Sequence, residues 1–389
     1  MYGIALEGGG AKGAYHIGAM KALYENGYEI GGYVGTSIGS FNAAILAQCD
    51  FDKLYNFWYN GSISDLIDIS ESDLQKFLKK KIDFPLIKSM GGYIKKIKAD
   101  RGIDISKYRK VISDMVDEDK LRNSGKDYGL VTVSVTDKKN LELFKEDIPK
   151  GEIEGYIMAS SYIPVFKMEK INEKYYIDGG FYDNCPVNML IRKGYTDIIS
   201  IRTGAIGISR KIKGAQKINL IEIRPSKDLG GILVADNRVS RNNIKMGYYD
   251  TLRVIKGIKG TTYYINPLEE NEFFNMLLNL SDESIYKLAG KTIKNAQDYD
   301  PKKLLFEKII PAISKKIRST DTKTYNDFAY NLIEFLLEYD GTAEVYKIHD
   351  FDEIIALLKK QANMMAKKER ANIVPNSTVE MIIRLITEI

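Results

Sequence analysis

Two kinds of reactive side chain are scarce in this 389-residue chain, which contains two cysteines and two histidines. Cys49 and Cys185 cannot form the dense disulfide framework of small secreted domains, so the sequence favours a reducing environment. Residues 1–6 show no basic region followed by a long apolar run, as a secretory signal would. No later stretch approaches the roughly 20 apolar residues of a membrane span. These absences predict a cytoplasmic protein.

A large net charge is absent as well. The formal charge is +5, which excludes the strongly basic surface typical of nucleic-acid binding, and no nucleic-acid partner is expected. The basic residues are unevenly distributed, because eleven of them lie between Lys79 and Lys110. Such a stretch is typical either of a surface that contacts anionic membrane headgroups or of an ordinary solvated helix face.

Short apolar runs alternate with helical patterns in the first part of the chain. Residues 2–6 and 30–34 read as strands, and residues 13–26 and 41–48 read as the helices that follow them. Three more β-branched, apolar runs predict strands, at residues 130–135, 197–201 and 220–223. Strands that alternate with helices predict a mostly parallel sheet covered on both faces.

The remaining segments read as helical. Residues 51–126 contain no clear strand and are predicted to form a helical cap inserted over one end of the sheet. Beyond about residue 267 only helical patterns occur, and Phe328, Leu332 and Leu336 form an apolar stripe there. Five helices are predicted in this part, at residues 284–295, 302–316, 325–338, 352–367 and 378–388. We therefore expect a first domain over residues 1–265 and a helical second domain over residues 266–389.

The segment Gly35-Thr36-Ser37-Ile38-Gly39 fits the pattern Gly-x-Ser-x-Gly between a strand and a helix. In this pattern the serine lies on a strained turn, and the flanking glycines avoid side-chain clashes. The N-terminus of the following helix favours negative charge near the serine. Ser37 is therefore a candidate nucleophile, although the five-residue pattern alone also fits an ordinary turn.

A glycine-rich loop, Gly8-Gly9-Gly10-Ala11-Lys12-Gly13, also lies between a strand and a helix. Its backbone N–H groups could converge on an anionic oxygen, as in an oxyanion hole. The loop also satisfies Gly-x-Gly-x-x-Gly, the dinucleotide-binding pattern. That pattern requires an acidic residue at the end of the second strand, where this chain has Gly35-Thr36-Ser37.

A nucleophilic serine needs a base, and the two histidines are poorly placed to supply it. His16 lies inside the first predicted helix, and His349 lies in the helical second part. A carboxylate can serve instead if it reaches the serine and has a suitable pKa. Asp178, which ends the short apolar run 174–177 and precedes Gly179-Gly180, is the candidate, although Asp-Gly is also a common turn.

The glycine-rich loop, the Ser37 elbow and Asp178-Gly179-Gly180 occur in an order that resembles the patatin-like phospholipase family. Residues 159–164 and 183–187 also match stretches typical of that family, and the resemblance extends over roughly residues 1–225. It implies a three-layer α/β/α sandwich with a mostly parallel central sheet, a helical cap insertion and an all-helical C-terminal region.

The resemblance also implies an activity, namely hydrolysis of acyl esters of phospholipids or other lipids by a Ser-Asp dyad without a metal or organic cofactor. It makes Ser37 the nucleophile and Asp178 the base, with Gly35 and Gly39 shaping the elbow and Gly179 and Gly180 following the acid. The oxyanion hole would come from the loop Gly8, Gly9, Gly10, Ala11, Lys12 and Gly13, where the family often has arginine at the Lys12 position. A catalytically weak lipid-binding regulatory protein and a dinucleotide-binding enzyme remain as alternatives.

Overall fold

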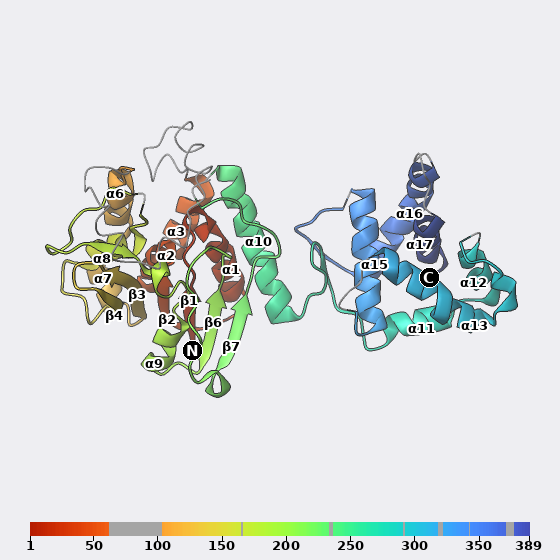
Figure 1. Ribbon diagram of the computed structural model, residues 1–389, viewed down its shortest axis with the longest axis horizontal. Coiled ribbons are helices and arrows are strands. Elements are labelled where there is room, and N and C mark those ends of the chain that lie inside the picture. The colour runs from red at the N-terminus through yellow and green to blue at the C-terminus, as the bar shows by residue number, and fades with distance from the viewer. Residues whose placement is uncertain are drawn as a thin grey trace. The chain divides into compact units, whose positions relative to one another are not determined.

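The chain forms two compact units, Met1–Val254 and Ile255–Ile389 (Figure 1). The computed structural model describes residues 1–61, 103–164, 166–232, 236–290, 292–317, 322–341, 343–370 and 377–389. Most of the cationic stretch and part of the expected cap insertion lie outside these residues. The expected domain boundary after residue 265 falls inside the second unit, because β8 (Tyr264–Ile265) pairs there with β9 (Ile348–His349).

The first unit is built on a seven-stranded sheet, and the predicted mostly parallel arrangement is confirmed. The strand order is β4-β3-β2-β1-β6-β7, and β5 pairs with β3 outside this path. All pairings among β3, β2, β1, β6 and β7 are parallel, whereas β4 and β5 run antiparallel to β3. The strands are β1 (Tyr2–Leu6), β2 (Ile30–Thr36), β3 (Asp127–Ser134), β4 (Lys139–Phe144), β5 (Tyr176–Asp178), β6 (Asp197–Ile201) and β7 (Asn219–Ile223).

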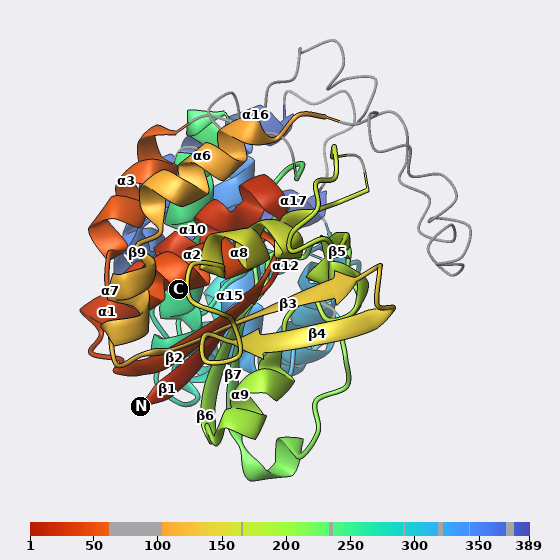
Figure 2. The same cartoon turned by 90° about the vertical axis from the view of Figure 1, so that its left-hand side faces the viewer.

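Helices cover both faces of this sheet, and the central strand β2 is therefore buried from end to end, whereas the edge strand β7 is only partly buried. On one face, α2 (Ile38–Ala47) packs on β2 and β3, and α8 (Ile153–Ser161) packs on β3 and β5. On the opposite face, α9 (Val187–Lys193) packs on β1, β2 and β6 (Figure 2). Strand β4 and helices α8 and α9 were not among the elements predicted from the sequence.

Two further helices of this unit pack backbone against backbone. They are α1 (Ala14–Glu25) and α10 (Asn237–Lys256). A Cβ on Gly18 would lie 1.8 Å from the Ile244 carbonyl oxygen, and a Cβ on Gly247 would lie 2.1 Å from the Tyr15 carbonyl oxygen. Only glycine allows an approach this close.

The described part of the expected cap region is helical. It comprises α3 (Phe51–Asn60), α6 (Ser106–Met115) and α7 (Glu118–Asn123). Trp58 on α3 donates its indole N–H to Asn42 on α2 at 2.9 Å, which ties the insertion to the core helix. Among the described residues, no helix combines the length and apolar character needed to span a bilayer.

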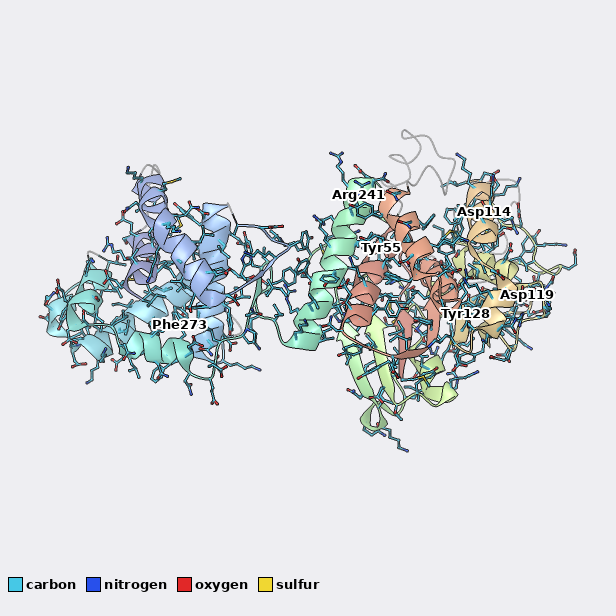
Figure 3. The ribbon with its side chains drawn as sticks, turned by 180° about the vertical axis from the view of Figure 1, so that it is seen from behind. Tyr55, Asp114, Asp119, Tyr128, Arg241 and Phe273 are labelled. Atoms are coloured by element: carbon cyan, nitrogen blue, oxygen red, sulfur yellow. The ribbon has the colours of Figure 1, made fainter. Side chains whose placement is uncertain are left out.

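The second unit has its own apolar core, which includes Phe273 and the expected stripe Phe328, Leu332 and Leu336 (Figure 3). The predicted helix over residues 284–295 ends early, at Ala289, because Gly290 adopts a positive φ of 47°. The predicted helix over residues 302–316 is interrupted by a π-turn at Leu305–Ile309. The α-helices of this unit are α11 (Glu272–Leu278), α12 (Asp282–Ala289), α13 (Pro301–Leu304), α14 (Ile310–Lys316), α15 (Tyr325–Asp340), α16 (Phe351–Arg370) and α17 (Ser377–Glu388).

Candidate active site

Ser37 lies on a sharp turn between β2 and α2, as the Gly-x-Ser-x-Gly pattern predicts. Its backbone adopts φ 56° and ψ −128°, a strained conformation for a residue with a side chain. The flanking glycines permit this turn, since a Cβ on Gly35 would lie 2.2 Å from the Gly39 carbonyl oxygen. A Cβ on Gly39 would lie 2.4 Å from the Leu6 carbonyl oxygen. Both positions therefore require glycine.

Two other serines, Ser160 and Ser40, hold the strained turn. The sequence alone indicated no role for either of them. The Ser37 N–H donates to Ser160 Oγ at 2.8 Å, and Ser160 Oγ in turn donates to the Val131 carbonyl oxygen at 2.7 Å. Ser40 Oγ donates to the Ser37 carbonyl oxygen at 2.6 Å. These bonds hold the backbone of Ser37, and its hydroxyl faces the cavity.

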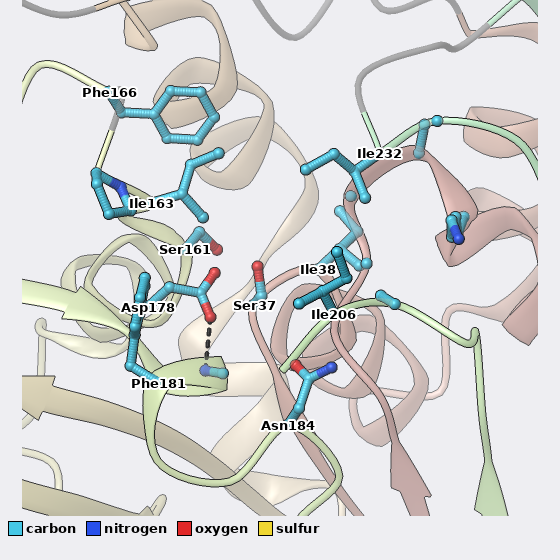
Figure 4. Close-up of a pocket in the computed structure, with 18 of the residues that line it drawn as sticks. Ser37, Ile38, Ser161, Ile163, Phe166, Asp178, Phe181, Asn184, Ile206 and Ile232 are labelled. Atoms are coloured by element: carbon cyan, nitrogen blue, oxygen red, sulfur yellow. Dashed lines mark hydrogen bonds between the residues drawn. The ribbon is translucent and has the colours of Figure 1, made fainter. Parts of the chain in front are cut away.

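Strand register brings Asp178 to Ser37, although the two residues are about 140 positions apart. Parallel strand β2 ends opposite β3 with Thr36 beside Val131. Antiparallel strand β5 ends beside the next residue of β3, with Asp178 opposite Thr132. The two strand ends therefore meet on adjacent β3 positions, and the Asp178 carboxylate faces the Ser37 hydroxyl (Figure 4).

The environment of Asp178 suits a base that works near neutral pH. Its side chain is 5% exposed, and burial raises the pKa of Asp178 to about 6. Hydrogen bonds from Ser37 and from the Gly180 N–H act in the opposite direction on this pKa. The Gly180 N–H donates to Oδ1 at 2.7 Å, which leaves Oδ2 for the serine. Gly179 must be small, since a Cβ there would lie 2.2 Å from the Val131 carbonyl oxygen.

The glycine-rich loop lies beside Ser37, but only part of it has free N–H groups. The N–H groups of Gly8, Ala11 and Lys12 donate to the carbonyl oxygens of Asn184, Ile232 and Gly9. Gly13 ends the 3₁₀ turn Gly10–Gly13 and packs against Trp58 and Ile38. Among the described residues, the N–H groups of Gly9 and Gly10 have no recorded acceptor. Of the expected oxyanion donors, Gly8, Ala11 and Lys12 therefore have occupied N–H groups, whereas those of Gly9 and Gly10 are available within the described part of the chain.

An apolar cavity of about 350 Å³ opens above Ser37 and Asp178. Among the described residues that line it, Lys12 and Asp178 are the charged ones. Lys12 Nζ lies 3.8 Å from a carboxylate oxygen of the exposed Asp228. Sequence reasoning had not assigned most of the apolar walls, which come from segments far apart in the chain: Ile38, Ile105, Tyr108, Ile163, Phe166, Phe181, Ile206 and Ile232.

Neither histidine belongs to this site. His16 is fully buried in α1, its Nδ1 lies 3.2 Å from Asn42 Nδ2, and burial lowers its pKa to about 3. His349 belongs to the second unit, where its Nε2 lies 2.8 Å from the Glu344 carbonyl oxygen. Within the part of the chain that the structure describes, no group of three or more histidine, cysteine or acidic side chains could hold a metal ion.

Comparison with known proteins gives one family match and several distant relatives. The family model of patatin-like phospholipase matches residues 4–191. A 91-residue segment is 33% identical to the patatin-like phospholipase domain-containing protein ZK370.4 of Caenorhabditis elegans, covering 22% of this chain and 7% of that protein. Over 300 residues the chain is 25% identical to lysophospholipase NTE1 of Candida glabrata, covering 74% of this chain and 15% of that protein.

The chain thus spans no more than 15% of the length of either curated relative. Among solved structures it is similar to VipD from Legionella pneumophila, with a TM-score of 0.42 and 15% sequence identity. That similarity covers all of this chain and 90% of the VipD chain.

Proposed function

Because residues 4–191 are a patatin-like phospholipase domain, we propose that this protein hydrolyses carboxylic esters of lipids through Ser37 and Asp178. The observation that carries the proposal is the juxtaposition of a strained serine and a buried carboxylate at the floor of an apolar cavity. A histidine base is unnecessary if the carboxylate reaches the serine directly.

In the first half of the proposed reaction, Asp178 Oδ2 accepts the proton of the Ser37 hydroxyl while Ser37 Oγ forms a bond to the ester carbonyl carbon. The carbonyl oxygen becomes an oxyanion, which the Gly9 and Gly10 N–H groups stabilise. The tetrahedral intermediate then breaks its bond to the alcohol oxygen. This alcohol takes the proton from Asp178 and leaves, while the acyl group stays on Ser37.

In the second half, Asp178 removes a proton from a water molecule, whose oxygen attacks the acyl carbon. The same two N–H groups stabilise the second oxyanion. The bond to Ser37 Oγ breaks, the serine recovers its proton from Asp178, and a free fatty acid leaves. The enzyme returns to its starting state without a metal or organic cofactor.

We propose lysophospholipids and related phospholipids as the substrate class. The apolar walls fit an acyl chain, and Lys12 supplies a positive charge at the cavity wall. The relatives named as lysophospholipases agree with this assignment. Contact with an anionic membrane surface remains a prediction based on the cationic stretch between Lys79 and Lys110, as does the cytoplasmic location.

The proposal is tested by assaying purified protein against a panel of lysophospholipids, phospholipids and neutral acylglycerols. We expect fatty-acid release by the wild-type protein, and release below a few per cent of that rate by Ser37→Ala and Asp178→Asn, because the nucleophile or its base is missing. Ser124→Ala, which changes a serine outside the cavity, serves as the matched control.

A fluorophosphonate probe gives a second measurement, since it should label the wild-type protein and Ser124→Ala but not Ser37→Ala. A folded wild-type protein that binds lipid without hydrolysis or labelling would instead favour the lipid-binding regulatory alternative.

A further inference from the structure

The peptide unit that joins Gly8 to Gly9 carries the Gly9 N–H, one of the two N–H groups of the glycine-rich loop that have no acceptor among the described residues. Its carbonyl oxygen, on Gly8, accepts a hydrogen bond from Thr203 Oγ1 at 2.6 Å. Thr203 follows β6 and is 1% exposed. The Gly8 N–H donates to the Asn184 carbonyl oxygen at 3.0 Å, so the backbone is held on both sides of Gly8.

The orientation of this peptide follows from its planarity. In a trans peptide the C=O and N–H groups point in opposite directions. Thr203 holds the carbonyl oxygen on one side, so the Gly9 N–H points away from Thr203. Gly9 lines the cavity that contains Ser37, and its N–H has no recorded acceptor among the described residues.

Thr203 is itself held by a buried carboxylate, that of Glu7. Glu7 is 2% exposed, and its Oε2 accepts the Thr203 N–H at 2.6 Å and the Gly204 N–H at 2.9 Å. Its Oε1 forms an ion pair with Arg202 at 3.2 Å. A buried charge is tolerated when it is paired and hydrogen-bonded, as this one is.

The single hydroxyl proton of Thr203 has two nearby acceptors. The Gly8 carbonyl oxygen lies at 2.6 Å, whereas Glu7 Oε2 lies at 3.3 Å. The shorter contact identifies the Gly8 carbonyl oxygen as the acceptor. The side chain also packs closely on the loop, since a Cβ on Gly9 would lie 2.7 Å from Thr203 Oγ1.

We propose that Thr203 is a positioning residue of the glycine-rich loop. It fixes and polarises the Gly8–Gly9 peptide, so that the Gly9 N–H stabilises the oxyanion. A hydrogen bond to the carbonyl oxygen of an amide strengthens its N–H as a donor. Glu7 and Arg202 act one step further away, by holding Thr203. This inference rests on the proposed ester hydrolysis and adds a residue that does not touch the substrate.

The test compares Thr203→Val, which has nearly the same shape but no hydroxyl, with Thr203→Ser, which keeps it. Both full-length variants are assayed on a soluble short-chain p-nitrophenyl ester, with active sites counted by fluorophosphonate titration. We expect kcat per active site to fall about tenfold in Thr203→Val with KM nearly unchanged, because the lost stabilisation applies to the transition state. Thr203→Ser should keep kcat within about twofold of the wild-type value.

A purely structural role for Thr203 would lower the number of active sites but not kcat per active site. Wild-type kcat per active site in Thr203→Val, or an equal loss in Thr203→Ser, would overturn the inference while leaving the proposed hydrolysis intact. If Thr203→Val does not fold, the same comparison is made between Thr203→Ala and Thr203→Ser. A wild-type protein that neither turns over the ester nor takes up the probe would overturn both proposals.

Discussion

At the scale of single residues, burial of one carboxylate connects the chemistry of the site to its stability. Asp178 is buried at the end of β5, where desolvation raises its pKa to about 6. A base with such a pKa is ionised at neutral pH and still accepts a proton readily. The same burial makes the ionised residue unfavourable for folding, so function and stability conflict at this position.

The pH dependence of hydrolysis should report this pKa. Asp178 acts as a base only when it is ionised, so kcat/KM should rise with pH and reach half its maximum near pH 6. The measurement is a pH profile of kcat/KM on a soluble ester. A profile that stays flat down to pH 4 would contradict the assignment of Asp178 as the base.

Asp178→Asn should stabilise the protein at pH 8 while it abolishes hydrolysis. The folded-state pKa, about 6, lies above the ordinary value of 3.8, so the native state holds this proton more tightly than the unfolded state. The contribution of Asp178 to the free energy of unfolding therefore falls as pH rises from about 4 to 6. The asparagine variant should have a free energy of unfolding higher by up to about 3 kcal/mol at pH 8.

Denaturant unfolding of both proteins at pH 8 and at pH 4 measures this difference. The difference in free energy of unfolding between Asp178→Asn and the wild-type protein should nearly vanish at pH 4, where Asp178 is largely protonated in the native state. A variant that is less stable than the wild-type protein at pH 8 would mean that the ionised carboxylate makes favourable contacts that outweigh its burial.

At the scale of secondary-structure elements, close backbone contacts set the positions of the helices around the site. The α1–α10 contact depends on Gly18 and Gly247, where any Cβ would overlap a carbonyl oxygen of the other helix. Helix α1 follows the glycine-rich loop directly, so a shift of α1 would also move that loop.

Gly18→Ala should therefore lower the free energy of unfolding by about 2–3 kcal/mol, even though alanine has the higher helix propensity. The reason is that the two helices must separate to admit the methyl group. Gly155→Ala in α8 is the matched control, because among the described residues its added Cβ would approach only a side-chain methyl group of Ile171, at 3.2 Å. Equal stability of the two variants in denaturant unfolding would contradict the expectation for Gly18.

At the scale of the whole molecule, the described residues of the candidate site all belong to the first unit, and the second unit has a separate core. A fragment of residues 1–256, which includes all of α10, should therefore fold and react with a fluorophosphonate probe. Its kcat on a soluble ester should lie within about threefold of the full-length value, since compact domains commonly fold alone. A folded fragment that fails to react would show that the second unit contributes to the site.

Local patterns in the sequence determined the fold class of the first unit and the candidate residues of the site. The apolar runs, the Gly-x-Ser-x-Gly elbow and the glycine-rich loop predicted the parallel sheet and the candidate residues, because each depends on neighbours a few positions apart. The scarcity of histidine directed attention to a carboxylate. Strand β4 was missed because its sequence has mixed polarity, and none of its residues is fully buried.

Only the tertiary structure decided which of these groups act together. Ser37 and Asp178 meet because β2 and β5 end on adjacent residues of β3, and strand register depends on the whole sheet rather than on local sequence. Likewise, the acceptors that occupy the N–H groups of Gly8 and Ala11 come from Asn184 and Ile232, far along the chain. The role inferred for Thr203 arises in the same way, because β6 pairs beside β1 and places the loop that follows it against Gly8.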